Sequence, residues 1–538
     1  MTTPPLPWRA LATAGALVIL AWTAVHGLRP LDFWSTPDDY AAHSLSHALN
    51  LEQALAENTA RRIGYFQYIH PGLPFQFVSW LDFRVAQLFT TTDSKNPVLS
   101  TLANPGGFWL ANRVSALGLL LAGLATAWCC ARRLDGVTAL VAALVFLSFQ
   151  PAWTHTVLRL GNESFALLLG AGLFGLLLRA FAGEQCLAGP WVIVGLLAGT
   201  AYLMKMNYVT WIIAAAIGLL TALVCRRGSV RPFVGRAALL VAGFAGGVVV
   251  LGVLALGTRG MHALFREQRR ILFHSGRYGG GDPEIFDEAA VAEAVRDIAA
   301  NLDLWLVPLC LAIITILVVA SRRKDRAWLK SNLPFVAGCG AAMVLGYAAA
   351  IKHFRPHYLV PVAAVLPALV TWIGESVNAR VRRFVAGVVA LSILLAGGKT
   401  WREYSGNLTH AAALREDCRR IEQLPLAASQ VRVWARVNSP AQIASTVILW
   451  SNTGSTYQPV LQTLYPHDAL YEIWDRKVYY QGQLVPPETV PWQYAILDRR
   501  RFPDFESVPA CYRDHGTELP GYQAVVVVAR TNPGITPL

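Results

Sequence analysis

Two adjacent carboxylates and two histidines stand close together after the first apolar run of the chain. Asp39, His43 and His47 recur at positions i, i+4 and i+8, which places the three side chains on one face of a helix. Carboxylate and imidazole groups suit a divalent cation such as Mg²⁺, Mn²⁺ or Zn²⁺. Asp39, His43 and His47 are therefore candidate metal ligands. Asp38, directly before them, repels Asp39, and such a pair usually binds a cation or a proton.

Plainer interpretations of these residues stay open. Pro37 and Asp38 precede an alanine-rich stretch, so an aspartate could cap the helix that begins there. The two histidines could equally form the polar face of an interfacial helix.

Basic residues at membrane depth are the second group that could do chemistry. Lys205 lies between two apolar runs with no room for a loop, where an ionisable residue is a functional candidate. Lys352, Arg355, His357 and Tyr358 crowd one short loop, and their charge suits an anion such as a lipid phosphate. The alternatives are that Lys205 reaches toward the interface and that the loop only touches lipid headgroups. Arg159 and Glu163 could form a local ion pair.

The composition indicates which elements carry these residues. Of the 538 residues, 54% are hydrophobic and only 15% are charged, whereas soluble globular chains carry about 25% charged residues. The formal net charge of +13 is scattered as short arginine clusters between apolar runs, which argues against a basic nucleic-acid-binding domain. The sequence therefore predicts an α-helical polytopic membrane protein.

Eleven apolar runs are candidates for transmembrane helices, although several are shorter than the ~20 residues of a straight span. The pair on either side of Lys205 is also compatible with one bent, re-entrant element, and the first run reads as a retained anchor. The runs are Leu11–Leu28, Phe108–Cys130, Val137–Trp153, Phe165–Phe181, Pro190–Leu203, Tyr208–Cys225, Ala237–Gly257, Leu302–Ala320, Leu333–Ile351, Tyr358–Ile373 and Phe384–Gly397.

Lysine and arginine near the ends of these runs predict the orientation. With a cytoplasmic N-terminus, sixteen of these residues fall in inner segments, and only Arg159, Lys205, Lys352 and Arg355 fall in short outer loops. The loops 29–107 and 258–301, and everything after residue 398, are then extracytoplasmic. The predicted domains are a transmembrane module, residues 1–398, and an outer domain, residues 399–538.

The outer domain is predicted to be small and mixed α/β. β-type runs such as Ser445–Trp450, Trp492–Leu497 and Tyr522–Ala529 are separated by turn signals, and Ala411–Leu424 reads as an amphipathic helix. Cys418 and Cys511 both fall in this domain, and two cysteines in an oxidising compartment predict one disulfide. Neither a nucleotide-binding glycine fingerprint nor an internal repeat is present in the sequence.

The order of these features resembles the GT-C superfamily of polyprenyl-phosphate-sugar-dependent glycosyltransferases, the class of protein O-mannosyltransferases and lipid A aminoarabinose transferases. Those enzymes place an acidic pair after the first span, followed by a His-Pro-Pro-Leu-like element in the same loop. Here the pair is Asp38-Asp39, and the element is His70-Pro71-Gly72-Leu73, with glycine in place of the second proline. Further similar stretches are Ser148–Pro151 with Arg159 and Glu163, Gly199–Lys205, and His357–Pro361.

The resemblance implies an inverting hexosyl- or pentosyltransferase of the cell envelope, in a bacterial inner membrane. It would move a sugar from a polyprenyl-phosphate donor to an acceptor hydroxyl of a lipid, glycan or protein on the extracytoplasmic face. Asp38 or Asp39 would act as base or metal ligand. Neutralising the lipid phosphate, which makes it a better leaving group, would fall to the basic residues. The substrate-binding set is His70, Arg159, Lys205, Lys352, Arg355, His357 and Tyr358.

Two other classes of protein stay open. A transporter or flippase for an amphipathic lipid-linked substrate would use the same basic groups for the headgroup, although repeated halves or paired broken helices are expected of one. A structural assembly protein whose outer domain binds partners is the third.

Overall fold

The computed structural model describes residues 40–56, 72–89, 96–157, 159–182, 189–226, 230–275, 282–352, 354–451, 454–473 and 475–531. These residues form two compact units. The helical unit comprises residues 72–75 and 113–401, and the sheet unit comprises residues 40–56, 76–112 and 402–531, each with the gaps just given. The predicted first span, Asp38, Asp39 and His70 lie outside the described residues.

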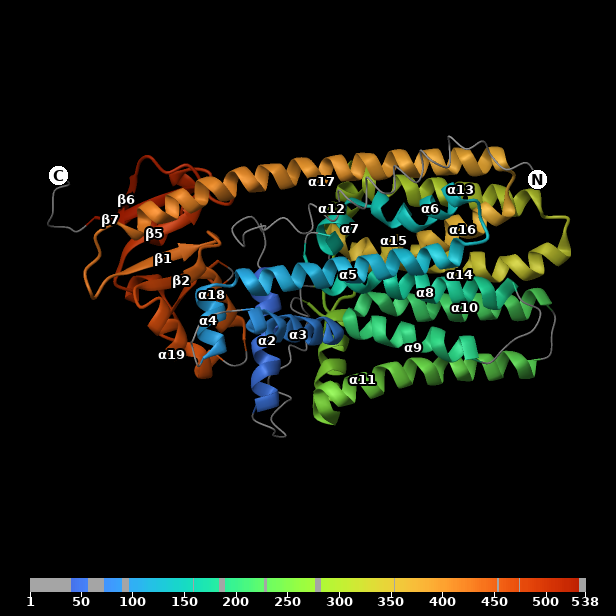
Figure 1. Ribbon diagram of the computed structural model, residues 1–538, viewed down its shortest axis with the longest axis horizontal. Helices are drawn as coiled ribbons and strands as arrows, with labels where there is room; N and C mark the ends of the chain where they lie inside the picture. Colours follow the sequence, from blue (N-terminus) through green and yellow to red (C-terminus); the bar gives the residue numbers. More distant parts are fainter. Residues whose placement is uncertain are drawn as a thin grey trace. The chain divides into compact units, whose positions relative to one another are not determined.

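The helical unit is built from apolar helices that run in alternating directions (Figure 1). Among the described helices, α3 (Leu73–Phe89), α5 and α17 have residues in both units. The helices are α5 Gly106–Ala131, α6 Gly136–Leu144, η3 Val145–Ser148, α7 Gln150–Ala152, η4 Trp153–Val157, η5 Asn162–Phe165, α8 Ala166–Ala182, α9 Gly189–Met204, η6 Met206–Tyr208, α10 Val209–Arg226, α11 Val230–Phe273, α12 Glu288–Ala300, η8 Leu302–Leu304, α13 Leu306–Ser321, α14 Arg326–Ile351, η9 Pro356–Leu359, α15 Val360–Ala363, α16 Leu366–Ser376 and α17 Ala379–Glu422.

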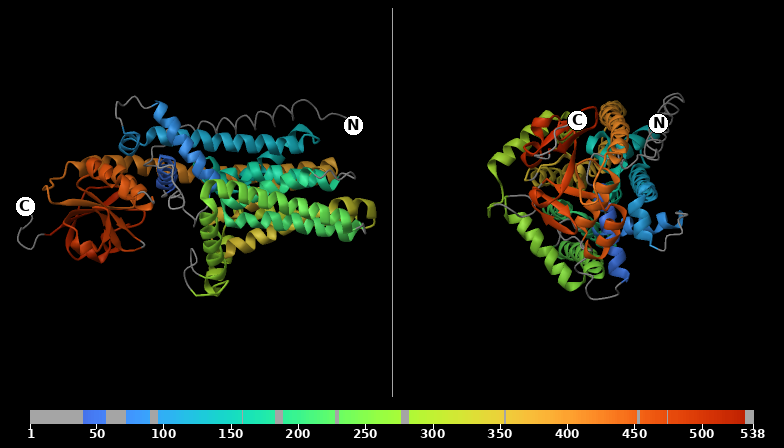
Figure 2. Two further views of the ribbon diagram at one scale, coloured as in Figure 1. Left: turned by 90° about the horizontal axis from the view of Figure 1, so that it is seen from below. Right: turned by 90° about the vertical axis from the view of Figure 1, so that its left-hand side faces the viewer.

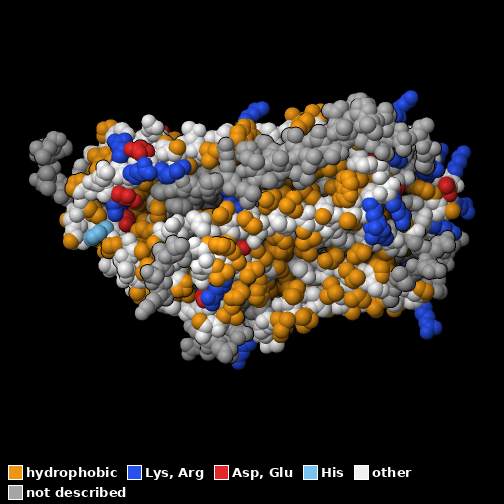
Figure 3. Space-filling view, in the orientation of Figure 1, with side chains coloured by type: hydrophobic (Ala, Val, Ile, Leu, Met, Phe, Trp, Pro, Cys, Tyr) orange, Lys and Arg blue, Asp and Glu red, His pale blue; other side chains and the backbone are white. Residues whose placement is uncertain are grey.

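Within the described part of the chain, seven helices are long and apolar enough to cross a membrane, or eight if one bent pair counts as a span. Two shorter apolar helices, α9 and α13, add to these. Every predicted apolar run that the structure describes is helical, so the chain is a multi-pass membrane protein, but the count of eleven spans is not confirmed. Apolar side chains cover much of the helical unit in Figure 3, as expected of a surface that faces lipid.

Helices α9 and α11 pack closely because glycines face each other. A Cβ atom on Gly195 or Gly199 would collide with the backbone of α11, and one on Gly243 or Gly247 would collide with the backbone of α9. Glycines spaced by four residues allow membrane helices to approach at backbone distance, where van der Waals contact replaces the missing hydrophobic drive. This contact holds the short α9 in place, and with it the residue that follows, Lys205.

The sheet unit contains a seven-stranded mixed sheet with strand order β4-β3-β2-β1-β5-β7-β6. Strand β1 pairs in parallel with β2 and β5, and the other pairs are antiparallel. The predicted mixed α/β domain is therefore confirmed. Its elements are α2 Tyr40–Ala56, α3 Leu73–Phe89, α4 Pro97–Ala103, β1 Val431–Ala435, α18 Pro440–Trp450, α19 Gly454–Leu464, β2 Asp468–Glu472, β3 Lys477–Tyr480, β4 Gln483–Val485, η10 Pro487–Thr489, β5 Trp492–Asp498, η11 Phe505–Ser507, α20 Ala510–Arg513, β6 Gly516–Leu519 and β7 Val525–Arg530.

The predicted strand at Ser445–Trp450 is wrong, because these residues form the second half of helix α18. Ser439 caps this helix by accepting a hydrogen bond from the Gln442 amide, and Pro440 occupies the first turn. The β-branched run inside the helix is buried, so tertiary packing overrides its strand propensity.

The predicted disulfide is also wrong, because Cys418 and Cys511 are both free thiols. Cys418, on α17, packs with Trp434 and Ile496 on one face of the sheet. Cys511, on α20, packs against Val433 and other side chains that alternate onto the opposite face. Each thiol is accommodated by apolar packing.

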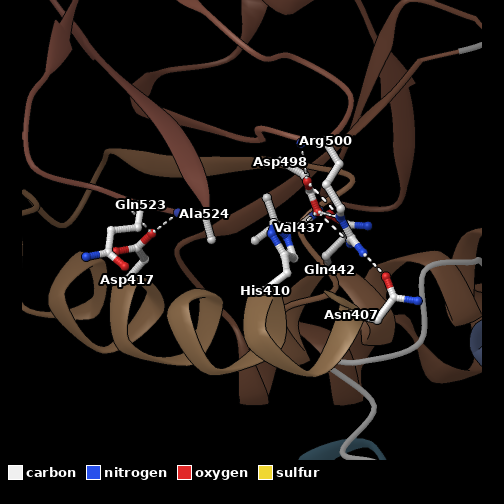
Figure 4. Close-up of polar contacts among 9 residues, drawn as sticks. All are labelled: Asn407, His410, Asp417, Val437, Gln442, Asp498, Arg500, Gln523 and Ala524. Carbon is white, nitrogen blue, oxygen red and sulfur yellow. Dashed lines mark hydrogen bonds and ion pairs between the residues drawn. The ribbon is translucent and has the colours of Figure 1, made fainter. Parts of the chain in front are cut away.

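The predicted helix Ala411–Leu424 is not separate, since α17 runs without a break to Glu422. In the sheet unit its polar contacts reach the end of β5 and the two residues before β7 (Figure 4). His410 Nε2 lies 3.2 Å from Asp498 Oδ2, and Arg500 donates to the same carboxylate at 2.8 Å. Asp417 accepts the backbone N–H groups of Gln523 and Ala524 at 2.9 and 2.6 Å. These bonds fix α17 on the sheet.

Candidate functional site

Lys205 stands at a break between two membrane helices. Helix α9 ends at Met204, Lys205 itself is extended, with φ −163° and ψ 139°, and η6 begins at Met206. The break directs the lysine side chain toward a carboxylate. Lys205 Nζ donates to Glu163 Oε1 at 2.7 Å, and the two side chains are only 14% and 2% exposed. Such a pair is retained in a low-dielectric setting only when each charge has its partner.

Glu163 is positioned by the turn that opens the α8 region. It lies in η5, where Ser164 Oγ accepts the Gly161 amide at 3.0 Å and donates to the His155 carbonyl at 3.1 Å. These bonds join the residues before and after the turn. The carboxylate is thereby held on the same side as His155, whose Nδ1 lies 3.9 Å from Glu163 Oε2.

The segment before this turn is strongly bent. Gly136–Ser148 and Gln150–Val157 meet at 85°, and Trp153–Val157 is a π-helical turn. Turns of this kind occur frequently at functional positions. The bend places Arg159 Nη2 against the His155 ring, 2.7 Å from Nδ1 and 2.8 Å from Nε2.

The loop after α14 completes the group. The His357 ring lies over the His155 ring, with centroids 4.6 Å apart. Lys205 Nζ lies 4.0 Å from the centroid of the Tyr358 ring, a cation–π distance. Asn207 Nδ2 donates to the Tyr358 carbonyl at 3.0 Å, which fixes this loop to the α9–α10 break.

We refer to these six residues as the Lys205 cluster: His155, Arg159, Glu163, Lys205, His357 and Tyr358. With neutral histidines it carries two cations and one carboxylate, a formal charge of +1. Hydrogen-bond donors and positive charge at the ends of apolar helices suit an anion, since charge-assisted hydrogen bonds are strongest where water is scarce.

Gly72 explains why this chain departs from the His-Pro-Pro pattern. Its φ of +37° lies in the left-handed region, which proline cannot adopt. Its N–H donates to the Met204 carbonyl at 3.1 Å, a bond that proline could not make. A Cβ atom at this position would collide with Asn162 Oδ1. Glycine thus allows the end of the motif to pack against the residues next to Lys205 and Glu163.

Four of the predicted substrate-binding residues come together in the Lys205 cluster: Arg159, Lys205, His357 and Tyr358. Lys352 does not join them, since its Nζ donates to the Leu272 carbonyl. Arg355 precedes the cluster on the same loop and is exposed. Asp38, Asp39 and His70 lie outside the described residues, so their roles stay predictions.

His43 and His47 belong to the sheet unit. Their rings are stacked with centroids 6.1 Å apart, and His43 also stacks on Trp450 at 4.4 Å. These aromatic contacts explain the positions of the two imidazole rings, and they do not require a metal ion. No group of three or more metal-binding side chains occurs among the described residues. Asp39 is not one of those residues, so the set of Asp39, His43 and His47 stays a prediction.

Sequence reasoning missed part of the cluster. It considered Glu163 only as a partner of Arg159, whereas its closest cation is Lys205. His155 and Asn207 were not singled out. One signal was available: His155 and Arg159 are four residues apart just beyond an apolar run, at the depth where polar groups need partners.

The chain thus has the features of a multi-pass membrane protein with a cationic cluster at its helix ends. Comparison with solved structures finds similarity to ArnT from Cupriavidus metallidurans bound to undecaprenyl phosphate, with 13% identity over 99% of this chain and 100% of that chain and a TM-score of 0.47. The apo state of the same protein gives 12% identity and a TM-score of 0.47, covering 99% of each chain. The apo oligosaccharyltransferase of Archaeoglobus fulgidus gives 12% identity and a TM-score of 0.44, covering 97% of this chain and 75% of that chain.

No protein-family model matches the sequence. No curated protein matches it either. The functional assignment below therefore rests on the residues and geometry of this chain.

Proposed function

We propose that this chain is a membrane glycosyltransferase that moves a sugar from a polyprenyl-phosphate donor to an acceptor hydroxyl on the extracytoplasmic face. The observation that carries the proposal is the Lys205 cluster, where two largely shielded cations and one buried carboxylate converge at the ends of α9 and α14. The order of motifs in the sequence, from Asp38-Asp39 to His357-Tyr358, supports the same class.

An anion bound here would be reached from the membrane. Lys205 directly follows the apolar helix α9, and His357 and Tyr358 open the buried, apolar span Pro356–Ser376. A site at the ends of apolar helices suits a phosphate at the head of a lipid chain, because the lipid reaches it within the membrane. A water-soluble nucleotide sugar would reach a site from the aqueous phase instead. Lys205 and Arg159 offer N–H donors to phosphate oxygens, and Tyr358 offers a ring face to the lysine.

The transfer step follows from these charges. The acceptor oxygen forms a bond to the anomeric carbon of the sugar as the bond from that carbon to the phosphate oxygen breaks. The phosphate oxygen keeps the electron pair, and Lys205 and Arg159 stabilise its growing negative charge. The acceptor proton passes to a carboxylate, for which we propose Asp38 or Asp39. Attack from the side opposite the leaving phosphate inverts the anomeric configuration.

Glu163 has a different role in this scheme. Its Oε1 is 2.7 Å from Lys205 Nζ, so it is engaged in holding the lysine. We propose that it positions Lys205 and lowers the net charge of the cluster in the absence of donor. Arg355 and His70 would then contact the donor from the rim of the site, and Asp39 with His43 and His47 would hold any divalent cation.

A transfer assay with the purified chain tests the proposal. A set of polyprenyl-phosphate sugars is supplied with a membrane extract as acceptor source, and released polyprenyl phosphate is measured by chromatography. Wild type should release it and Lys205→Met should not. The matched control is Lys399→Met, because Lys399 forms an ion pair with Asp303 and its side chain is 42% exposed. Donor that crosses vesicle membranes with its sugar still attached would favour a flippase and contradict the transferase.

A further inference from the structure

Helix α11 changes direction near its middle. Gly257 has φ 67° and ψ 175°, which are non-helical values, and the chain resumes a helix beyond it. Residues 258–273 form what we call the crossing segment. In Figures 1 and 2 it turns away from the long first half of α11 and runs across the ends of neighbouring helices. The first half, Val230–Leu254, is a candidate membrane span, so the segment begins where a span ends.

Two side-chain bonds fix the crossing segment to the helical unit. Tyr202, in the last turn of α9, donates its hydroxyl to Gln268 Oε1, and Gln268 is 5% exposed. Lys352, directly after α14, donates to the Leu272 carbonyl. Lys205 follows α9 and the loop with His357 follows α14. The segment therefore lies at the same end of the helical unit as the Lys205 cluster.

The outer surface of the crossing segment has two kinds of side chain. Phe265, Leu272 and Phe273 are 47%, 46% and 48% exposed, so this surface presents three large apolar side chains to the surroundings of the protein. Four arginines stand against one glutamate in the segment, a formal net charge of +3, and all four are exposed: Arg259, Arg266, Arg269 and Arg270. Glu267 lies 3.7 Å from Arg266 and 3.5 Å from Arg270, so it offsets only one of these charges.

The order of these side chains around the helix is informative. At ~100° per residue, the buried side with Met261 and Leu264 is followed by Leu272 and Phe265, and then by the arginines, with Phe273 among them. Leu272 and Phe265 thus form an apolar strip between the side that contacts the protein and the side that carries the positive charge. A helix that lies in a membrane interface has this arrangement, with apolar side chains toward the acyl chains and arginines level with the headgroups.

We infer that the crossing segment lies in the outer membrane interface and binds anionic phospholipid headgroups. The apolar side chains favour contact with lipid, and the excess of three positive charges favours lipids with a negatively charged headgroup. Each arginine near an anionic surface strengthens binding by ~1 kcal/mol, a factor of about five. This inference is independent of the proposed function. It assigns a lipid surface to residues that take no part in the Lys205 cluster.

Lipid binding to the purified full-length chain tests the inference. The chain in neutral detergent is mixed with dioleoyl phosphatidylglycerol or dioleoyl phosphatidylcholine, and bound lipids are counted by native mass spectrometry. Wild type should prefer phosphatidylglycerol. In Arg266→Gln/Arg269→Gln the preference should fall about fivefold for each arginine removed. The control is Arg419→Gln/Arg501→Gln, which removes the same charge from two exposed arginines of the sheet unit.

Three results would overturn the inference. One is equal retention of the two lipids by wild type, and another is an equal loss of preference in the variant and the control. The third is displacement of phosphatidylglycerol by the same concentration of glycerol phosphate, which would indicate a phosphate site and not a lipid surface. Phe265→Gln/Leu272→Gln separates the apolar contribution, since it should weaken retention of both lipids alike.

Discussion

Lys205 and Glu163 are 42 positions apart in the chain, yet Lys205 Nζ lies 2.7 Å from Glu163 Oε1. The pair joins the break after α9 to the turn before α8, and both side chains are largely shielded from solvent. Removing one member deprives the other of its closest oppositely charged partner, whereas removing both takes the two charges away together. The pair therefore separates a structural role of Lys205 from a role in binding phosphate.

We predict that Lys205→Met lowers the free energy of unfolding by about 3–5 kcal/mol, because Glu163 loses its partner. Lys205→Met/Glu163→Gln should recover most of this loss, since both charges of the pair are removed together. Neither variant should bind polyprenyl phosphate or support transfer. Thermal unfolding in detergent and binding of a fluorescent polyprenyl phosphate measure the two effects separately.

Lys399→Met is the control for this pair, because its partner Asp303 lies in a more exposed setting. The expected change is at most ~1 kcal/mol. If the stable double variant binds polyprenyl phosphate as wild type does, Lys205 has only a structural role.

Gly72 offers a test of how the first-loop motif is positioned. Gly72→Ala should destabilise the chain by ~1–2 kcal/mol for the positive φ, with a further loss from the collision with Asn162. Gly72→Pro should be worse, although the related motif has proline here, because the bond to the Met204 carbonyl is lost as well. The measurement is thermal unfolding of the purified variants.

The double variant Gly72→Ala/Asn162→Ala separates the backbone strain at Gly72 from the collision with Asn162. Removing the Asn162 side chain relieves the collision and leaves the backbone strain, so the double variant should be more stable than Gly72→Ala alone. Equal stability of the two variants would show that the segment around Gly72 adjusts freely and is not held beside Lys205.

Asp498 predicts how the stability of the sheet unit depends on pH. Burial opposes its ionisation, but hydrogen bonds from His410 and Arg500 outweigh burial and lower the pKa of the carboxyl. An acid with a lowered folded pKa adds stability above its unfolded pKa of about 3.9, and this stability is lost as the pH falls through the folded value. Wild type should therefore lose stability below about pH 4.

Asp498→Asn should already lack this stability at pH 7, and its unfolding temperature should fall less steeply than that of wild type below pH 4. Asp514→Asn is the control, since Asp514 is 58% exposed and pairs only with the neighbouring Arg513 among the ion pairs described. A parallel pH dependence in wild type and Asp498→Asn would show that the network in Figure 4 contributes nothing.

The helices were predictable because a long apolar run is stable in a membrane only when its backbone hydrogen bonds are satisfied within a helix. The 85° bend before His155 was not, since Pro151 alone does not set its direction. The pairing of Lys205 with Glu163 could not be predicted either, because neither the register of α8 against α9 nor the turn at Glu163 has a local sequence signature. The strand prediction at Ser445–Trp450 was wrong for another reason: these side chains suit a strand, and only the cap at Ser439 indicates a helix.

The thiols show a further limit of the sequence. Two cysteines in a domain predicted to be extracytoplasmic are a sound reason to expect a disulfide, but the strand residues around Cys418 and those around Cys511 lie on opposite faces of the sheet. Burial raises the pKa of the Cys511 thiol to about 11, which also disfavours the reactive thiolate. Both facts follow from packing that the spacing of cysteines does not encode.

The last prediction concerns the carboxylates of the first loop. Asp38→Asn or Asp39→Asn keeps the size of the side chain and its capping oxygen, but removes the negative charge and most of the basicity. If either residue is the base, transfer at saturating donor should fall by ~100-fold or more in a folded, membrane-inserted protein. A helix cap predicts near-normal rates instead, and a loss of at most ~1–2 kcal/mol of stability even for alanine. Binding of polyprenyl phosphate to the Lys205 cluster should persist in both variants, because the cations that hold it are untouched. Rates near those of wild type in both would make the carboxylates structural and shift the weight toward a lipid transporter.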